Sequence, residues 1–267
     1  MEKLGFRLID CHAHVGRLPG TVGYIVTGDE LDYALKNEGV LYALASSASV
    51  TTVGQEYGNA EAVREVAKHP DTIGGMIWIN PHDPGWEEDA EATLKHGFLG
   101  IKLHPTLDHY KAGKDSLGGV FAFAAKHRLS ILTHAQEGDA APLNYIELVE
   151  QYPDVKVVFA HFGPGVQGIV MAKKYDNVYL DTTGVPAFTI WIAVAAAGSE
   201  KVLFGTDSPM GYKVGDGPER PEFRTFRKAT DEIRSLGLRD MEFENIFYKN
   251  SVKVFNIRLG GGAEGSR

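Results

Sequence analysis

The chain has 267 residues, of which 43% are hydrophobic and 23% are charged. This composition is ordinary for a globular protein with one large core, and it excludes extensive disorder. The net charge of −8, without any cluster of lysines or arginines, argues against nucleic-acid binding, which needs a basic surface to displace the counterions of phosphate.

The sequence contains no apolar run of about 18 residues that would span a membrane, and residues 1–3 do not resemble the start of a signal peptide. We therefore expect a cytoplasmic protein that does not associate with membranes. The single cysteine, Cys11, excludes an internal disulfide bond.

Short apolar segments alternate with amphipathic segments along the chain. The apolar segments are rich in Val, Ile and Leu and predict strands at residues 7–14, 40–44, 73–79, 97–103, 130–134, 155–161, 178–181 and 201–206. The intervening segments predict helices at residues 29–37, 60–68, 86–96, 116–127, 142–151, 166–175 and 188–197. Polar loops are expected at residues 15–24 and 46–58, and two further helices at residues 219–236 and 241–255.

Eight strands that alternate with helices predict an α/β fold of the (β/α)₈ TIM-barrel type, with a doubly wound open sheet as the alternative. The barrel is favoured because nearly every predicted strand ends in a polar residue, and barrel enzymes carry their catalytic groups at the carboxyl ends of the strands. We expect a single domain over residues 1–257, including the extra C-terminal helices, and a disordered tail over residues 258–267.

The first predicted strand contains two histidines in the sequence Asp10-Cys11-His12-Ala13-His14. Because side chains alternate between the two faces of a strand, regular alternation places Asp10, His12 and His14 on one face. The same rule turns Cys11 toward the outer helices, where it would pack as a small apolar residue. Two histidines at this spacing are as typical of a polar patch as of a metal site, so a metal site needs ligands from elsewhere in the chain.

Candidate partners for this histidine pair lie in or directly after other predicted strands. They are Lys102 and His104 in the fourth strand, His134 in the fifth, His161 in the sixth and Asp207 after the eighth. Imidazoles and a carboxylate form a ligand set suited to Zn²⁺, Mn²⁺ or Fe²⁺. With an open coordination position, such an ion lowers the pKa of a bound water to near 7. Asp207 would then bind the ion and accept the proton of that water, and His161 would act as an acid or a base.

These motifs resemble those of the amidohydrolase superfamily, and within it the amidohydrolase-related (amidohydrolase 2) group of TIM-barrel metal-dependent hydrolases and decarboxylases. In chain order, the resemblance rests on Asp10-Cys11-His12-Ala13-His14, Gly100-Ile101-Lys102-Leu103-His104-Pro105, Thr133-His134, Ala160-His161-Phe162-Gly163, Asn177-Val178-Tyr179-Leu180-Asp181-Thr182 and Phe204-Gly205-Thr206-Asp207. It covers nearly the whole chain and stops at the tail.

The resemblance implies a metal centre and identifies its ligands. His12, His14, His134 and Asp207 would bind the metal, and His161 would be a catalytic residue or a ligand of a second metal. One or two divalent ions per chain are implied, with Zn²⁺ expected and Mn²⁺ or Fe²⁺ as alternatives. The family also implies a homodimer or a homotetramer.

Several further positions stay open at this stage. Lys102 would be either a carboxylated bridge between two metals, as in the dihydroorotase-like branch, or an uncarboxylated charge partner, and His104 is an equally placed candidate ligand. Glu137 and Tyr24 are candidate contacts of substrate, although a glutamate in a loop is usually only solvated. We interpret Asp181 as a structural residue that bonds with neighbouring loops.

We expect a metal-dependent hydrolase that attacks an amide, ester or lactone bond of a small molecule with a metal-activated water. Three alternatives remain: a nonoxidative decarboxylase of a small aromatic or unsaturated acid, a diiron oxygenase on the same fold, and a metal-stabilised binding protein without turnover. Tyr24 and Trp78 are among the aromatic residues that could line the substrate site, although packing explains them equally well. The loops that set specificity carry no charge pattern that identifies a substrate.

Overall fold

The computed structural model describes residues 6–18, 25–209 and 226–259. Within these ranges, one sheet has the strand order β2-β1-β3-β4-β5-β6-β7-β8-β9. The parallel strands are β1 (Ile9–Arg17), β3 (Tyr42–Ser47), β4 (Ile73–Trp78), β5 (Gly100–Leu103), β6 (Ser130–His134), β7 (Val157–Ala160), β8 (Val178–Asp181) and β9 (Val202–Leu203). Each corresponds to a predicted strand, and the short antiparallel strand β2 (Ile25–Val26) pairs with the end of β1.

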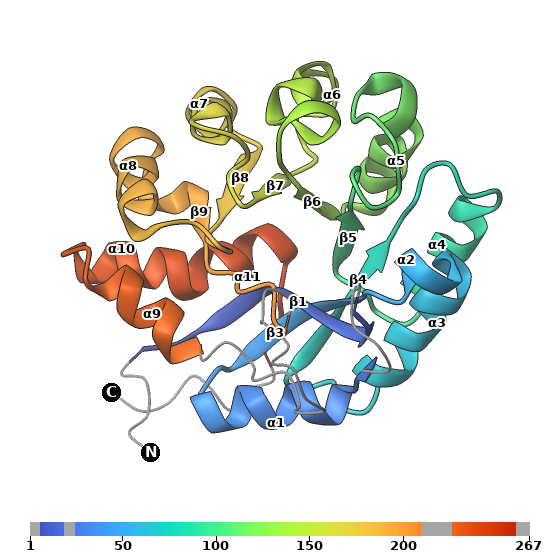
Figure 1. Ribbon diagram of the computed structural model, residues 1–267, viewed down its shortest axis with the longest axis horizontal. Helices are drawn as coiled ribbons and strands as arrows, with labels where there is room; N and C mark the ends of the chain where they lie inside the picture. Colours follow the sequence, from blue (N-terminus) through green and yellow to red (C-terminus); the bar gives the residue numbers. More distant parts are fainter. Residues whose placement is uncertain (1–5, 19–24, 210–225, 260–267) are drawn as a thin grey trace, which may run out of the picture.

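The sheet curls until the segment that follows β9 reaches β1. The backbone N–H of Asp207 donates to the carbonyl of His12 at 2.8 Å. The N–H of His14 donates to the carbonyl of Ser208 at 2.7 Å, next to a parallel bridge between Ala13 and Ser208. Figure 1 shows the resulting ring of helices around the curled sheet. The TIM-barrel prediction is therefore confirmed, and the alternative of an open doubly wound sheet is wrong.

The outer helices follow the predicted order. They are α1 (Gly28–Glu38), α2 (Val50–Val53), α3 (Gln55–Val66), α4 (Trp86–Leu94), α5 (Lys114–His127), α6 (Ile146–Gln151), α7 (Gln167–Lys174), α8 (Ala187–Ala197) and α9 (Phe226–Arg234). The Thr27 side chain caps the start of α1, and Gly39 with φ 74° ends it, as the sequence predicts. Residues 219–225 of the penultimate predicted helix lie outside the described residues, as do residues 260–267 of the predicted tail.

Two predicted loops are shorter in the structure than in the sequence analysis. β1 continues to Arg17 because β2 pairs with its last residues, so the loop expected at residues 15–24 begins later. Helices α2 and α3 occupy most of the loop expected at residues 46–58. The β-branched residues of α2 favour a helix poorly, and the tertiary structure overrides this local preference.

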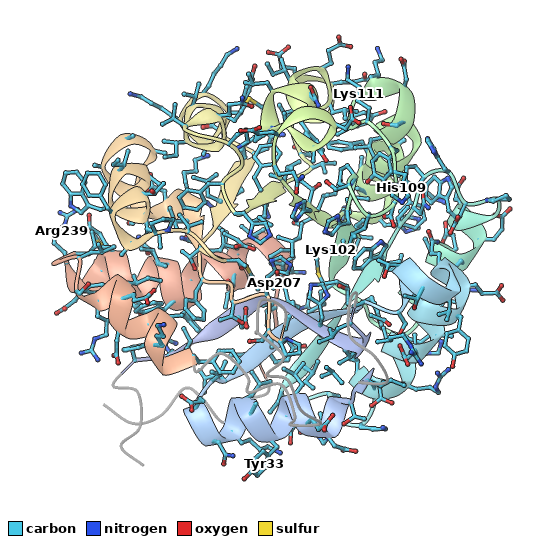
Figure 2. All side chains as sticks on the ribbon, viewed as in Figure 1. Tyr33, Lys102, His109, Lys111, Asp207 and Arg239 are labelled. Carbon is cyan, nitrogen blue, oxygen red and sulfur yellow. The ribbon has the colours of Figure 1, made fainter. Side chains whose placement is uncertain are left out.

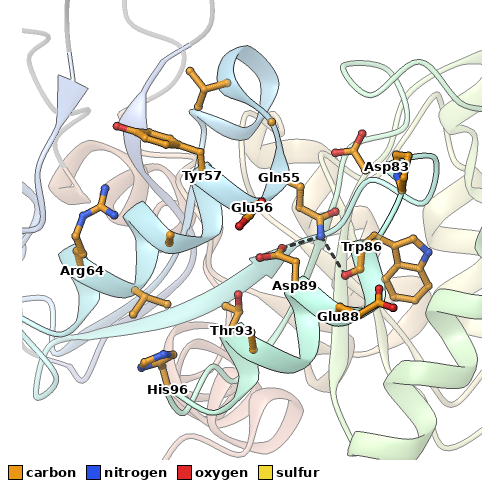
Figure 3. Close-up of a pocket in the computed structure, with 17 residues that line it drawn as sticks. Gln55, Glu56, Tyr57, Arg64, Asp83, Trp86, Glu88, Asp89, Thr93 and His96 are labelled. Carbon is orange, nitrogen blue, oxygen red and sulfur yellow. Dashed lines mark hydrogen bonds between the residues drawn. The ribbon is translucent and has the colours of Figure 1, made fainter.

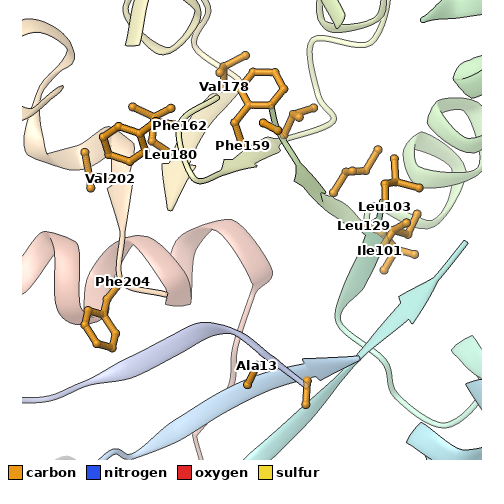
Figure 4. Close-up of a cluster of buried hydrophobic side chains, with 14 of the residues drawn as sticks. Ala13, Ile101, Leu103, Leu129, Phe159, Phe162, Val178, Leu180, Val202 and Phe204 are labelled. Carbon is orange, nitrogen blue, oxygen red and sulfur yellow. The ribbon is translucent and has the colours of Figure 1, made fainter. Parts of the chain in front are cut away.

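The last predicted helix is a continuous run of α10 (Asp240–Glu244), a π-helical turn (Asn245–Lys249) and α11 (Asn250–Phe255). Val254, Phe255 and Ile257 from this end of the chain pack with the apolar residues inside the barrel. A larger apolar layer lies between the strands and the outer helices, and Figure 4 shows part of it around Ile101 and Phe159. No helix in the described ranges is long and apolar enough to cross a bilayer.

β1 contains a bulge that regular alternation does not foresee. Between Asp10 and Ala13, β1 has one residue more than β3. The extra residue reverses the alternation, so Cys11 packs inside the barrel while Ala13 packs toward the outer helices. The prediction that Cys11 faces the outer helices is therefore wrong. His12 and His14 nevertheless converge, and Asp10 bonds with the segment after β9.

Candidate metal centre

Three of the predicted ligands meet where β1 lies against the segment after β9. Oδ1 of Asp207 lies 2.9 Å from Nε2 of His14 and 3.2 Å from Nε2 of His12. One donor atom from each of the three side chains lies within 4.8 Å of the other two. Donors bound to one ion at about 2.1 Å lie roughly 3 to 3.5 Å from one another, and the two distances from Asp207 are close to this range. Figure 2 shows Asp207 and Lys102 near the middle of the ring of helices.

Asp181 holds the ring of His12. The Nδ1–H of His12 donates to Oδ2 of Asp181 at 2.7 Å, and both side chains are buried. The other oxygen of Asp181 accepts the backbone N–H of Thr183 at 2.6 Å. With its proton on Nδ1, His12 presents the lone pair of Nε2 to the carboxylate of Asp207. Nε2 of His12 and the carboxylate of Asp207 are then two acceptors that face each other. A cation bound between them would stabilise this arrangement.

The charge states of these residues also fit metal binding. Burial, and next the charge of Lys102, lower the pKa of His12 to about 4. Burial likewise lowers the pKa of His14. Neutral imidazole is the form that binds a metal. Burial opposes ionisation of Asp207, but the neighbouring imidazoles and Lys102 outweigh it and lower the pKa of this carboxyl group. The three residues therefore present two neutral nitrogens and one anionic oxygen.

Lys102 lies directly beside this group, as the sequence predicts for the fourth strand of the barrel. Its side chain is 1% exposed, and its Nζ lies 2.5 Å from Nε2 of His12. Burial lowers the pKa of Lys102. This contact uses the Nε2 lone pair of His12, which would also bind a metal. One lone pair cannot bind Lys102 and a metal ion at the same time. Lys102 must therefore move away from Nε2 when His12 binds an ion.

His134 and His104 lie next to the three ligands but are not part of that group. Their rings stack on each other with centroids 4.0 Å apart, and Trp78 stacks on the other face of the pair with its centroid 5.8 Å from that of His104. The Nε2–H of His134 donates to Oε1 of Gln136 at 2.7 Å, which turns this nitrogen toward its own loop. His104 accepts the N–H of Leu107. The metal-ligand role of both histidines stays a prediction.

His161 completes the row of histidines at the end of the barrel. Its ring centroid lies 4.9 Å from that of His134 and 5.9 Å from that of His12. Its Nδ1–H donates to the carbonyl of Thr183 at 2.9 Å, which leaves Nε2 able to accept a proton. His161 and Asp207 both have left-handed backbones, with φ of 61° and 59°. Such strain in residues other than glycine is typical of functional positions.

The remaining candidates contribute less to the geometry. Glu137 is exposed at the start of a 3₁₀ turn after β6. Tyr24 lies outside the described residues. The contact between Asp181 and His12 is not predicted from the sequence. The available signal was the position of Asp181 at the end of the seventh barrel strand, on the same rim as the histidines.

A cavity of about 1170 Å³ lies elsewhere, between α3 and α4 (Figure 3). Gln55 crosses it and donates from Nε2 to Oδ2 of Asp89 at 2.8 Å and to the carbonyl of Trp86 at 3.2 Å. None of the residues that line the cavity belongs to the metal group. The candidate metal group at the barrel end is therefore separate from this cavity.

Replacement of Asp181 by asparagine is expected to weaken metal binding by about 10-fold to 100-fold, because the carboxylate that orients His12 would be lost. The measurement is a competitive zinc titration of the metal-free protein. Asp89→Asn is the matched control, since Asp89 bonds with Gln55 and Asn59 in the outer layer. Equal zinc affinity in Asp181→Asn and the unaltered protein would show that Asp181 does not orient a ligand.

Residues 9–257 match the family model described as Amidohydrolase. A search of curated proteins finds no significant match. Among similar solved structures, 5-carboxyvanillate decarboxylase from Sphingomonas paucimobilis has a TM-score of 0.71 and 14% sequence identity, over 95% of this chain and 100% of that chain.

Two further structures have names from other reaction classes. A probable 2-pyrone-4,6-dicarboxylic acid hydrolase from Acinetobacter baumannii has a TM-score of 0.67 and 16% identity, over 94% of this chain and 100% of that chain. The 4-oxalomesaconate hydratase from Rhodopseudomonas palustris has a TM-score of 0.65 and 16% identity, over 93% of this chain and 95% of that chain. At these identities the structures establish the shared fold, whereas the family model covers most of the sequence. The chain therefore belongs to the amidohydrolase family.

Proposed function

We propose that this protein is a metal-dependent hydrolase that acts on an amide, ester or lactone bond of a small molecule. The observation that carries the proposal is the meeting of His12, His14 and Asp207, with two neutral imidazoles and one carboxylate around a common point. When bound there, a divalent ion would act as a Lewis acid and activate water at neutral pH. We propose Zn²⁺ as the ion, with Mn²⁺ or Fe²⁺ as alternatives.

The protein's own residues supply binding, orientation and proton transfer. Asp181 fixes the tautomer of His12, and the Ser46 hydroxyl, 3.1 Å from Nδ1 of His14, can pair with either tautomer of that ring. The carboxylate of Asp207 can hold a proton on its way to the leaving group. His161 is the second proton carrier, because Thr183 occupies Nδ1 and leaves Nε2 for the substrate.

The stacked rings of Trp78, His104 and His134 form one wall beside this group. Asp108 holds the Trp78 ring of this wall in place, because the indole Nε1–H of Trp78 donates to Oδ2 of Asp108 at 2.9 Å. Trp78 is 1% exposed, so His104 and His134 are the members that substrate would reach. A row of nearly parallel rings suits a planar, unsaturated substrate.

Nonoxidative decarboxylation of a small unsaturated acid is the second candidate. It is favoured by the stacked wall and by the decarboxylase among the similar structures. The names of the three compared proteins all specify carboxylate-bearing compounds. Both candidates therefore lead to the same substrate class for a first screen: small unsaturated carboxylic acids, with and without a lactone or ester.

Metal analysis of the purified protein is expected to give at least one tightly bound ion per chain, and removal of the ion by a chelator should abolish turnover. His12→Ala should lose the ion, because it removes one of the three converging donors. His96→Ala is the control, since His96 is exposed and lines the cavity between α3 and α4. Less than one ion per chain, or unchanged metal content in His12→Ala, would refute the metal-dependent function.

When small unsaturated carboxylic acids are screened as substrates, release of carbon dioxide without oxygen consumption would identify the protein as a decarboxylase. Bound iron together with oxygen consumption would assign an oxygenase, and tight metal binding without turnover would leave a metal-stabilised binding protein.

Lys102→Ala tests whether one metal or two bind. If Lys102 acts as an uncarboxylated amine, the variant should retain the metal content of the unaltered protein, because the three donors of the group remain. If a carboxylated Lys102 bridges two ions, the variant should lose one of about two ions per chain. Mass spectrometry of the intact protein under native conditions, with metal content measured in parallel, distinguishes these results.

A further inference from the structure

Asp10 is a buried carboxylate that joins the two chain segments carrying the metal ligands. Its side chain is 0% exposed. Oδ1 accepts the backbone N–H of His12 at 3.0 Å and the backbone N–H of Thr206 at 3.0 Å. Oδ2 accepts the hydroxyl of Thr206 at 2.5 Å. Asp10 therefore bonds with His12, a proposed ligand, and with Thr206, the residue directly before the proposed ligand Asp207.

On the β1 side, Asp10 stabilises the bulge. The additional residue of a bulge lies outside the regular ladder, so its backbone groups need other partners. The bond from the N–H of His12 to Oδ1 of Asp10 supplies such a partner inside the irregular stretch between Asp10 and Ala13. His12, the first of the three proposed ligands, lies inside this irregular stretch. Loss of the Asp10 carboxylate would therefore leave the backbone of His12 less firmly held.

On the opposite side, Asp10 acts on Asp207 through Thr206. The hydroxyl of Thr206 lies 2.8 Å from Oγ of Ser208 and accepts the N–H of Ser208 at 3.1 Å. Thr206 and Ser208 flank Asp207, whose φ of 59° is unfavourable for a residue with a side chain. The network from Asp10 holds both neighbours of the strained ligand.

We propose that Asp10 is a positioning residue of the metal centre: one buried carboxylate keeps His12 and Asp207 close enough to bind a single ion. The proposal rests on the proposed metal binding, and it is independent of the reaction that the metal supports. It assigns a function to the first residue of the Asp10-Cys11-His12-Ala13-His14 motif, which bonds with both segments.

The test compares two chemically mild variants of this network. Asp10→Asn keeps the shape of the side chain but replaces one acceptor oxygen by an amide donor, and Thr206→Val removes the hydroxyl at nearly constant volume. Both are expected to weaken zinc binding by the metal-free protein at least about tenfold, the range found for groups that orient metal ligands. Both should also change the visible absorption spectrum of the Co²⁺-substituted protein, which reports coordination geometry. Thr206→Ser retains the hydroxyl and should restore both properties.

Asp32→Asn is the matched control, because Asp32 is also buried, at 6% exposure, and accepts the hydroxyl of Thr72 at 2.6 Å far from the centre. It should lower the thermal midpoint without changing zinc affinity or the Co²⁺ spectrum. If Asp10→Asn does not fold, the comparison of Thr206→Val with Thr206→Ser decides.

Wild-type zinc affinity and an unchanged Co²⁺ spectrum in Thr206→Val would overturn the proposal, as would an equal loss of affinity in Asp32→Asn. These results leave metal binding by the unaltered protein intact. Failure of the unaltered protein to bind zinc or Co²⁺ would instead refute the proposed function and this inference together.

Discussion

The candidate metal centre depends on backbone hydrogen bonds that close the barrel. Asp207 follows the last barrel strand and His12 lies in the first, and the bond from the N–H of Asp207 to the carbonyl of His12 brings them together. Further bonds, from the N–H of Cys11 to the carbonyl of Phe204 and from the N–H of His14 to the carbonyl of Ser208, extend this seam between β1 and the segment after β9. Residues from the two ends of the chain can therefore share an ion here. The carboxylate of Asp10 crosses the same seam and bonds with both sides. The same contacts that close the barrel therefore also bring the proposed ligands together.

A second constraint is the cost of burying charge. His12, His14 and Lys102 lie beside one another with almost no exposed surface, and full protonation of all three would be strongly unfavourable. The protein places the carboxylates of Asp181 and Asp207 against His12 from two directions. The imidazoles stay neutral and the carboxylates stay ionised, which is the state that a divalent cation requires. The polar interior of the barrel end is thus matched to a cation by its own electrostatics.

Much of this could be predicted from the sequence. The spacing of apolar segments predicts eight strands and the barrel, and polar residues at strand ends make His12, His14, His134 and Asp207 candidate ligands. The structure brings His12, His14 and Asp207 into one group, whereas His134 lies outside it. The orientation of Cys11 could not be predicted, because a single bulge residue reverses the alternation on which that prediction depends. The contact between Asp181 and His12 was also missed, since it joins strands that are distant in sequence. Side chains that orient a ligand leave no periodic pattern, whereas ligands at strand ends do.

The most direct test of this account is a crystal structure of the protein grown with Zn²⁺, with diffraction measured on both sides of the zinc absorption edge. The account predicts an anomalous peak for one zinc ion. This ion should be coordinated by Nε2 of His12, a nitrogen of His14 and an oxygen of Asp207, each at about 2.0 to 2.2 Å. Lys102 should have moved away from Nε2 of His12, or should carry a carboxylate that contacts a second ion. A zinc peak that lacks His12 and Asp207 as ligands, or no peak at the barrel end, would contradict the account.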